Sequence, residues 1–344
     1  MAFLSIRNVE IVGFSACVPK QVIPAISTTD KYGTDAFTEA TGVIEKRYSN
    51  DFTTSDLGQA AAEKLISELG WNKKEIGILI FVSQTPDYIL PATSCILQDK
   101  LGLAKDCYAL DISLGCSGWV YGLSVIGSLM QTGMIKRGIL IAGDARKQCY
   151  EEPDQLFGFA ATATAIEFNE SSEGFKFHFG TDGSGYDAII KPVGGTRNQV
   201  TAQDLVPKLC PDGRKRHGFQ TQMKGMDVFA FGISTAPKSI KKLFAEFDID
   251  PSTIDYYIFH QANRKMNETI RKKMNLSEEQ VPYSITHFGN TSSASIPLTI
   301  VTQIAEKVRS NRTEFIACGF GVGLSWGTVY FTTDNIIIPE IVEL

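Results

Sequence analysis

Cys116 is the residue of this chain best placed by its surroundings to act as a nucleophile. It lies in Asp111-Ile-Ser-Leu-Gly-Cys-Ser-Gly-Trp119, after a strand-like segment and directly before an apolar helix-forming run. Backbone N–H groups at the start of a helix favour a thiolate, which is the reactive form of cysteine. A buried structural cysteine is the commoner fate of this residue type, but the position and the flanking glycines favour the nucleophile.

Two further polar residues follow apolar segments in the second half of the chain. His260 ends the strand-like part of Ile258-Phe-His-Gln-Ala-Asn263, and Asn290 lies in His287-Phe-Gly-Asn-Thr-Ser-Ser-Ala-Ser295. Taken alone, the histidine could be a satisfied core residue and the asparagine could cap the following helix. A glycine-rich segment at 318–326 could bring backbone N–H groups to an oxyanion, but such turns are common.

An internal repeat relates these residues to one another. Lys64–Val82 and Lys242–His260 align without a gap, and each reads as a helix end, a polar turn and a buried strand. The identical pairs are Lys64/Lys242, Leu65/Leu243, Glu68/Glu246, Ile76/Ile254, Ile80/Ile258 and Phe81/Phe259. The same order of elements continues beyond the repeat, so that Asn290 falls close to the position matching Cys116.

The repeat predicts an α/β protein built from two similar halves. Its strands are short apolar runs without alternation, which is typical of a sheet covered by helices on both faces. We place the halves at residues 1–175, carrying Cys116, and 176–344, carrying His260 and Asn290. Residues 181–222 have no counterpart in the first half and are predicted to form a surface excursion.

Composition narrows the class of protein. The 344 residues carry a formal net charge of −5, which argues against nucleic acid as the main partner. No basic region precedes an apolar block at the N-terminus, and no apolar run is long enough to span a membrane, so we expect a cytoplasmic protein with no membrane partner. Seven cysteines without a CxxC pair indicate reduced thiols and no structural metal site.

Six segments, in this order, resemble the thiolase superfamily, and most closely its ketoacyl-acyl-carrier-protein synthase III branch. They are SQTPDYILPATSCILQDKLGL, DISLGCSGW, MKGMDVFAF, HQAN, FGNTSSASIP and GFGVGLSWG. The resemblance covers nearly the whole chain. It implies a thiolase-like duplicated fold, layered αβαβα, with pseudo-twofold-related halves.

The resemblance also implies a Cys-His-Asn site and a reaction. Cys116 would take an acyl group from acyl-CoA or an acyl-carrier protein, with the backbone N–H groups of Cys116 and Val322 as the oxyanion hole. His260 and Asn290 would bind the thioester carbonyl of malonyl-carrier protein and stabilise the enolate left by loss of CO₂. The acyl group would then undergo Claisen condensation by covalent ping-pong catalysis, without a cofactor.

Other family features are carried over to matching residues. The basic helix segment after His260 would dock the carrier protein, although a solvated charged face would look the same. Its residues are Arg264, Lys265, Arg271, Lys272 and Lys273. The resemblance also implies a homodimer, in which the segment Tyr88-Ile-Leu-Pro91 reaches towards the active site of the partner subunit. Leu90 and Phe320 are therefore expected to line the acyl pocket at the dimer contact.

Differences from relatives favour one reaction but leave the acyl donor open. A thiolase has a second cysteine where this chain has Phe320, and a hydroxymethylglutaryl-CoA synthase has a glutamate where this chain has Thr85. Decarboxylative condensation therefore fits the sequence better than the reaction of either enzyme. The usual CoA-gripping tryptophan and arginine are missing from Asp35–Gly42. Gln155 stands where relatives have another CoA-contacting arginine. The segment at 160–165 reads AATATA, where relatives usually have GDGAGA.

Two alternatives to condensation stay open at this point. One is an acyltransferase that passes the Cys116 acyl group to a hydroxyl, amine or sugar. The other is a catalytically idle partner of a carrier protein, which would predict a lost nucleophile.

Overall fold

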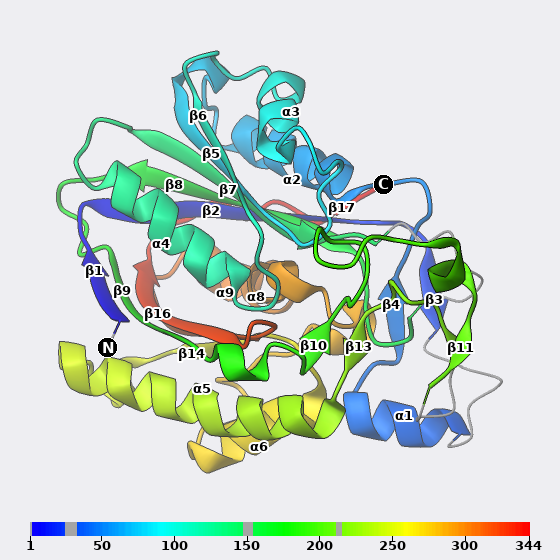
Figure 1. Ribbon diagram of the computed structural model, residues 1–344. Coiled ribbons are helices and arrows are strands. Elements are labelled where there is room, and N and C mark those ends of the chain that lie inside the picture. The colour runs from blue at the N-terminus through cyan, green and yellow to red at the C-terminus, as the bar shows by residue number, and fades with distance from the viewer. Residues whose placement is uncertain (1, 25–32, 147–153, 211–214) are drawn as a thin grey trace.

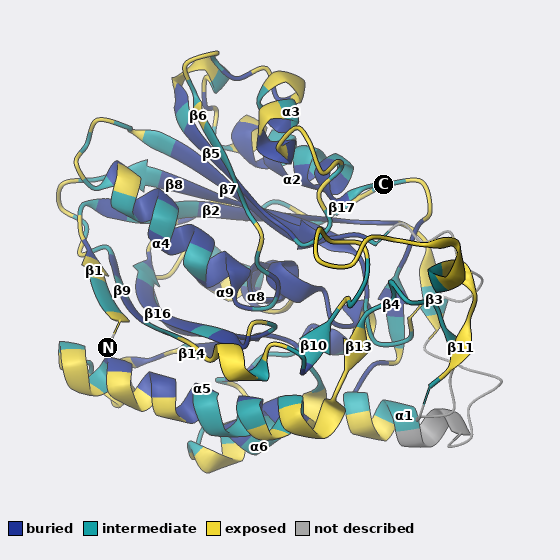
Figure 2. Ribbon diagram, in the orientation of Figure 1, coloured by how far each residue is buried: buried dark blue, intermediate teal, exposed yellow. Residues whose placement is uncertain are grey.

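Two β-sheets are stacked with helices between them and on both outer faces (Figure 1). The computed structural model describes residues 2–24, 33–146, 154–210 and 215–344, with the side chains of 33–36 left aside. The succession of helix, sheet, helix, sheet and helix confirms the predicted αβαβα layering. The buried residues concentrate in the sheets and in the helices between them (Figure 2).

The first sheet has six strands in the order β17-β2-β8-β7-β5-β6. Strand β5 pairs in parallel with β6 and β7, whereas β8 is antiparallel to both β7 and β2. The bounds are β2 Val9–Val18, β5 Ile76–Val82, β6 Tyr108–Ile112, β7 Arg137–Asp144, β8 Ala160–Phe168 and β17 Val342–Glu343.

The second sheet has five strands in the order β1-β9-β16-β15-β14. Strands β14 and β15 are parallel, and the other neighbours are antiparallel. The bounds are β1 Ala2–Ile6, β9 Phe175–Thr181, β14 Tyr256–Phe259, β15 Thr313–Gly321 and β16 Ser325–Thr333.

Helices complete the layers because each presents an apolar stripe to a sheet. Helices α2 and α3 cover the outer face of the first sheet, α4, α8 and α9 lie between the sheets, and α5 and α6 cover the outer face of the second (Figure 1). Their bounds are α2 Thr54–Glu68, α3 Thr93–Lys100, α4 Gly118–Met130, α5 Gly225–Phe247, α6 Arg264–Lys273, α8 Ser295–Thr299 and α9 Ala305–Arg309. Among the described residues, we find no helix with the length and apolar character needed to cross a membrane.

The structure reproduces the repeat in three dimensions. In each half a long helix is followed by a single 3₁₀ turn and then by a buried parallel strand. The turns are η1 Lys73–Glu75 and η4 Pro251–Thr253, and they occupy matching positions in the sequence alignment. Asn72 and Asp250 cap these turns through side-chain oxygens, so the same local chemistry starts both.

The two halves exchange their end strands. Strand β1 from the N-terminus pairs with β9 in the second sheet, and β17 from the C-terminus pairs with β2 in the first. Strand β9 of the second sheet begins at Phe175, and the division of the chain into halves at 1–175 and 176–344 stays a prediction. The sequence repeat gave no sign of this exchange, because it covers neither end of the chain.

Short elements surround one end of the stacked sheets. Helix α1 Gly33–Thr41 contains most of the segment that lacks the CoA-gripping residues. The predicted excursion at 181–222 is mostly exposed and forms small strand pairs. The strand pairs here are β3 Val22–Pro24 with β4 Glu45–Arg47, β10 Ile189–Ile190 with β13 Gln222–Met223, and β11 Lys208–Leu209 with β12 Lys215–Arg216. The remaining short elements are the 3₁₀ turns η2 Gly183–Gly185, η3 Ala202–Leu205 and η5 Ser292–Ala294, the one-turn helix α7 Ile285–Phe288 and the π-helix η6 Ile300–Ile304.

The AATATA segment begins β8, in the middle of the first sheet. Ala161, Ala163 and Ala165 are buried towards α2. On the opposite face, Trp119 Nε1 of α4 donates to Thr164 Oγ1 at 3.0 Å. The segment therefore joins α2 and α4 to the sheet, through small residues on one face and a hydrogen bond on the other.

Thr164→Val should destabilise the fold, because it leaves the fully buried Trp119 N–H without its acceptor. The expected loss is about 1–3 kcal/mol in the free energy of unfolding. Urea unfolding of the two single variants, Thr164→Val and Trp119→Phe, and of the double variant measures it. The double variant should lose less than the sum of the singles; additive losses would show that this hydrogen bond contributes nothing.

Candidate active site

Cys116 lies between β6 and α4, with the backbone of β15 packed against it. A Cβ atom placed at Gly319 would come within 2.7 Å of the Cys116 carbonyl oxygen. At Gly321 it would come within 2.7 Å of the Cys116 sulfur. Such distances are shorter than any ordinary contact, so only glycine at these two positions lets β15 approach the cysteine.

The environment of the Cys116 sulfur has opposing effects on its pKa. Burial raises the pKa of the thiol to about 11, and the Asp144 carboxylate acts in the same direction. The backbone N–H groups of Val322 and Cys116 and the Arg146 charge oppose this shift. The expected stabilisation of the thiolate at the helix start is therefore outweighed, since burial disfavours the charged form more strongly.

His260 is held in one orientation at the end of β14. Its backbone N–H donates to the Cys318 carbonyl at 2.9 Å, and its Nδ1 lies 2.8 Å from Ser295 Oγ. The imidazole is almost completely buried, which lowers its pKa to about 3; the Ser292 backbone carbonyl acts in the opposite direction. The ring is therefore neutral at physiological pH.

Ser295 also fixes the tautomer of this neutral ring. The Gln261 N–H donates to Ser295 Oγ at 3.3 Å, so the serine oxygen is an acceptor there. Among the residues that the structure describes, His260 Nδ1 is the acceptor left for the serine hydroxyl proton. The serine therefore donates to Nδ1, and the ring proton lies on Nε2, which becomes a hydrogen-bond donor.

Asn290 is oriented by the backbone that follows it. Its Oδ1 accepts from the Ser292 N–H at 2.9 Å, which leaves the Nδ2 amide group free to donate elsewhere. Ser292 has a φ of 53°, in the left-handed region that non-glycine residues seldom adopt. The cap position of the following turn is taken by Thr291, so Asn290 does not occupy the cap. Its bond to the Ser292 N–H instead orients the amide nitrogen as a donor.

Several contacts bring the three predicted residues to one place. The Ser292 backbone contacts both Asn290 and His260. A Cβ atom at Gly118, two residues after Cys116, would lie 3.5 Å from the Ser293 side chain. Strand β15 contacts Cys116 through its glycines and His260 through the Cys318 carbonyl. The sheet ends and the turn at 290–293 therefore converge, as the repeat predicts.

A buried carboxylate that sequence reasoning missed organises the polar loop beside Cys116. Asp144 Oδ1 accepts from Ser83 Oγ, the Gln84 N–H and Thr85 Oγ1 at 2.9–3.0 Å. Its Oδ2 is buried without a partner among the described residues. Thr85, which replaces the glutamate of another family branch, is thus committed to this network. The signal available in the sequence was an aspartate at the end of an apolar strand, next to last in RGILIAGDA.

Two residues of β15 point away from Cys116, into the core beneath α5. Cys318 is fully buried and accepts from Thr328 Oγ1 at 3.2 Å, and burial raises its pKa to about 12. This agrees with its interpretation as a structural strand residue. Phe320 is also buried there, and its ring meets the His260 ring edge-on at 5.9 Å. The assignment of Phe320 to the acyl pocket stays a prediction.

The basic segment forms α6, but its five cations are not equivalent. Arg264, Lys265, Lys272 and Lys273 are exposed. Arg271 is instead tied to Glu268 at 2.8 Å and to Glu278 at 3.3 Å, and it also donates to the Leu276 carbonyl. Its charge is largely satisfied within the chain, so we remove it from the predicted docking surface.

Leu90 and Gln155 differ in their surroundings. Leu90 is 84% exposed, in an apolar segment with Tyr88 and Ile89. Gln155, which replaces a CoA-contacting arginine, is partly buried, and its Oε1 has no partner among the described residues. Their roles at the dimer contact and towards the acyl donor stay predictions.

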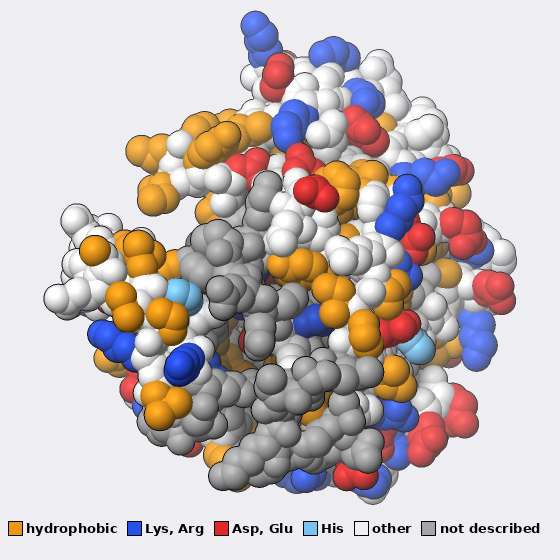
Figure 3. All heavy atoms as spheres, turned by 90° about the vertical axis from the view of Figure 1, so that its right-hand side faces the viewer, with side chains coloured by type: hydrophobic (Ala, Val, Ile, Leu, Met, Phe, Trp, Pro, Cys, Tyr) orange, Lys and Arg blue, Asp and Glu red, His pale blue; other side chains and the backbone are white. Residues whose placement is uncertain are grey.

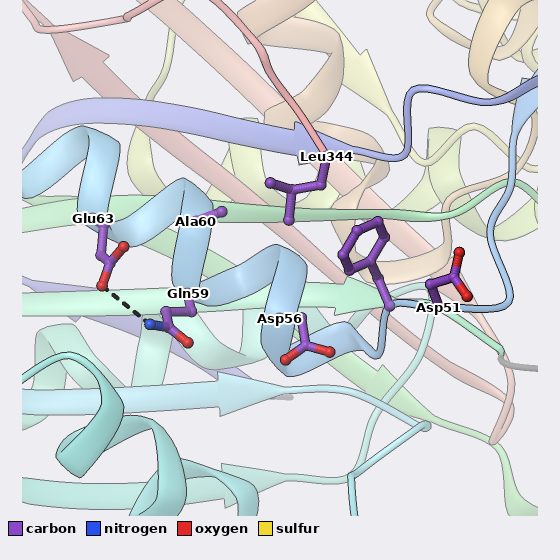
Figure 4. A pocket seen from close by; sticks show the side chains of 7 residues that line it. Asp51, Asp56, Gln59, Ala60, Glu63 and Leu344 are labelled. Atoms are coloured by element: carbon purple, nitrogen blue, oxygen red, sulfur yellow. Dashed lines mark hydrogen bonds between the residues drawn. The ribbon is translucent and has the colours of Figure 1, made fainter.

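A hollow of about 430 Å³ lies on another part of the molecule, between α2 and the C-terminal residue (Figure 4). Its lining residues are Asp51, Phe52, Asp56, Gln59, Ala60, Glu63 and Leu344. None of the predicted catalytic residues belongs to it, and the Glu63 carboxylate is already engaged by the Gln59 amide, which donates to it at 3.1 Å. We do not assign the chemistry to this hollow.

Comparison with known proteins places this architecture in a family. Residues 110–183 match the family model described as 3-oxoacyl-[acyl-carrier-protein] synthase III, and residues 244–333 match the model of its C-terminal part. These two regions contain Cys116, His260 and Asn290.

Individual relatives extend the similarity to nearly the whole chain. A β-ketoacyl-[acyl-carrier-protein] synthase III of Clostridium perfringens is 31% identical over 335 residues, covering 93% of this chain and 98% of that protein. A protein of the same name from Sulfurovum is 32% identical, with 88% and 87% covered. The crystal structure of a 3-oxoacyl-(acyl-carrier protein) synthase from Burkholderia xenovorans superposes with a TM-score of 0.92 at 34% identity, covering 100% of this chain and 99% of that one. The chain therefore belongs to the β-ketoacyl-[acyl-carrier-protein] synthase III family of thiolase-fold enzymes.

Proposed function

We propose that this member of the family, a condensing acyltransferase, works through an acyl-Cys116 intermediate and a malonyl-type extender. The observation that carries the proposal is the orientation of two neutral donors. The serine at 295 leaves Nε2 of His260 protonated, and the Ser292 N–H leaves Nδ2 of Asn290 free. Two such donors suit an oxygen that becomes negatively charged.

In the first half-reaction, Cys116 attacks the carbonyl carbon of an acyl thioester. A bond forms from the cysteine sulfur to that carbon, the bond from carbon to the donor sulfur breaks, and the donor leaves as a thiol with the cysteine proton. The N–H groups of Cys116 and Val322, which both act on this sulfur, are suitably placed to stabilise the tetrahedral oxyanion.

In the second half-reaction, His260 and Asn290 bind the thioester carbonyl of the malonyl group. Loss of CO₂ leaves an enolate, whose negative oxygen both side chains stabilise. The enolate carbon attacks the acyl-enzyme, a carbon–carbon bond forms, and the Cys116 sulfur is released. No side chain has to remove a proton from carbon, and no cofactor is needed, because decarboxylation supplies the carbanion.

Condensation accounts for this site better than the two alternatives. An acyltransferase using a hydroxyl or amine needs a base for the acceptor, and burial lowers the pKa of His260 to about 3, which makes it a poor one. An idle partner of a carrier protein would have no reason to keep a cysteine among backbone donors. Transfer to a sugar or amine therefore stays the weaker candidate.

The surface of α6 suits an acidic carrier protein. Arg264, Lys265, Lys272 and Lys273 are exposed on the helix that begins four residues after His260. On the face shown in Figure 3, Lys and Arg side chains are interspersed with Asp, Glu and hydrophobic ones, so the positive charge there is not concentrated. We expect binding of acyl- and malonyl-carrier proteins to weaken as salt rises, which a titration at several ionic strengths tests.

A homodimer in the cytoplasm is consistent with the surface and the cysteines. The apolar segment Tyr88–Leu90 is strongly exposed, and edge strand β6 leaves one side unpaired in its sheet. Exposed apolar segments and open strand edges favour contact with another chain. Free thiols at the described cysteines suit a reducing compartment. Sedimentation equilibrium tests the dimer.

Cys116→Ala should abolish acylation, because it removes the nucleophile. Intact mass after incubation with assorted acyl-CoAs and acyl-carrier proteins, and then with malonyl-carrier protein, measures both half-reactions. Cys318→Ala is the matched control and should still gain and discharge the acyl group. An adduct retained by Cys116→Ala, or one that malonyl donors never discharge from the natural protein, would contradict the proposal.

The two half-reactions should differ in their pH dependence. Acylation should speed up as pH rises through neutrality, because burial raises the pKa of the Cys116 thiol to about 11 and only the thiolate attacks. Condensation by pre-acylated enzyme should stay flat between about pH 5 and 8, because His260 is already neutral there. Single-turnover measurements separate the steps. A condensation rate that changes with pH around the ordinary pKa of histidine would contradict this prediction, because it would show that a charged His260 forms.

Ser295→Ala should slow condensation while sparing acylation, since it frees the His260 ring to take the other tautomer. We expect a loss of about 10- to 100-fold in the condensation step. Ser293→Ala is the control, because this buried hydroxyl nearby donates to the Val82 carbonyl and, among the described residues, not to His260. Equal slowing of both half-reactions in Ser295→Ala would indicate a general structural defect instead.

A further inference from the structure

Arg146 introduces a positive charge close to the residues that handle the acyl group. It lies two residues beyond the end of β7, and its guanidinium carbon is 4.5 Å from the centre of the Phe157 ring. Phe157 pairs with Asn290 through a backbone bridge. The Arg146 charge also acts on the Cys116 sulfur. The guanidinium therefore lies against Phe157, the bridge partner of Asn290, and close enough to Cys116 for its charge to act on the sulfur.

Lys191 adds a second cation from the excursion at 181–222. It directly follows β10, whose partner β13 begins just after Thr221, and Arg146 Nη1 donates to Thr221 Oγ1 at 3.3 Å. Burial and the Arg146 charge both lower the pKa of Lys191, so the two cations act on each other. Part of Lys191 nevertheless stays exposed to solvent. The excursion therefore contacts Arg146 through Thr221 and adds a second cation near it.

These cations are not neutralised within the described part of the chain. Neither Arg146 nor Lys191 forms an ion pair there, in contrast to Lys224, which is 2.6 Å from Asp187. Among the described residues, Asp144 is the carboxylate that acts on Lys191, and its Oδ1 is already used by three hydrogen bonds. Within that part of the chain, two positive charges therefore face one negative charge, and a bound anion would relieve the repulsion between the cations.

We propose that Arg146 and Lys191 bind a carboxylate on the acyl group of the donor, so that the enzyme prefers dicarboxylic acyl groups, such as succinyl, to neutral ones. The inference rests on the proposed role of Cys116 as the acyl carrier. It names the class of donor that the missing CoA-gripping residues left open.

Two other anions fit these positions less well. The phosphates of CoA or of a carrier protein lie at the far end of the pantetheine arm, whereas Arg146 acts on the sulfur that receives the acyl group. The malonyl carboxylate is lost as CO₂, and a cation pair holding it would stabilise the ground state against decarboxylation. An acyl carboxylate is retained throughout the reaction, so its binding carries no such penalty.

The test compares succinyl and butyryl thioesters of N-acetylcysteamine, which have equal chain length and carry no phosphate. The rate of Cys116 acylation is measured by intact mass. The natural protein should prefer the succinyl thioester. Arg146→Leu should slow succinyl transfer by about 10- to 100-fold more than butyryl transfer, which loses only the effect of the guanidinium on the Cys116 thiolate. Lys191→Leu should act in the same direction, and Arg146→Lys should retain most of the preference.

Arg197→Leu is the matched control, since this exposed arginine belongs to the same excursion and should not alter the preference. Equal rates with both thioesters, or equal slowing of both by Arg146→Leu, would overturn this inference while leaving the acyl-Cys116 intermediate intact. A preference that appears only with CoA thioesters would assign the cations to a phosphate. Failure of every thioester to acylate Cys116 would overturn the proposed function as well.

Discussion

The close approach of β15 to Cys116 is the constraint on which the rest of the site depends. Glycines at 319 and 321 let the strand backbone lie against the cysteine, and the next residue along the chain, Val322, brings its N–H to the sulfur. The same strand receives the His260 backbone N–H one residue before Gly319. One strand therefore sets the positions of the nucleophile, the oxyanion donor and the histidine, which come from different halves of the chain.

Burial has opposite consequences for the two titratable side chains of the site, and both suit the proposed reaction. It keeps His260 neutral, so that Ser295 can decide which ring nitrogen carries the proton. It also keeps Cys116 protonated until a substrate arrives, because the isolated thiolate is disfavoured in such surroundings. Backbone donors compensate only when negative charge develops at the sulfur or at the substrate oxygen, which is when stabilisation speeds the reaction.

Much of this architecture could be predicted from the sequence because the chain contains its own comparison. The gapless repeat relates Val82 to His260, and the shared order of elements relates Cys116 to Asn290; periodicity alone could do neither. What the sequence could not supply were effects that depend on packing. The pairing of Arg271 with Glu268, the exchange of β1 and β17, and the raised pKa of Cys116 all require knowing which groups meet.

The charges around Cys116 suggest why a cation is placed where an acyl chain must lie. The carboxylate of Asp144 is needed to hold the loop at 83–85, yet its charge disfavours the thiolate nearby. Arg146 offsets that effect while the sulfur is negatively charged. Once the thioester has formed, the sulfur carries no charge and the guanidinium has lost one of its anionic neighbours. The carboxylate of a dicarboxylic acyl group would take that place, so that the same cation assists the thiolate before acylation and holds the acyl carboxylate afterwards.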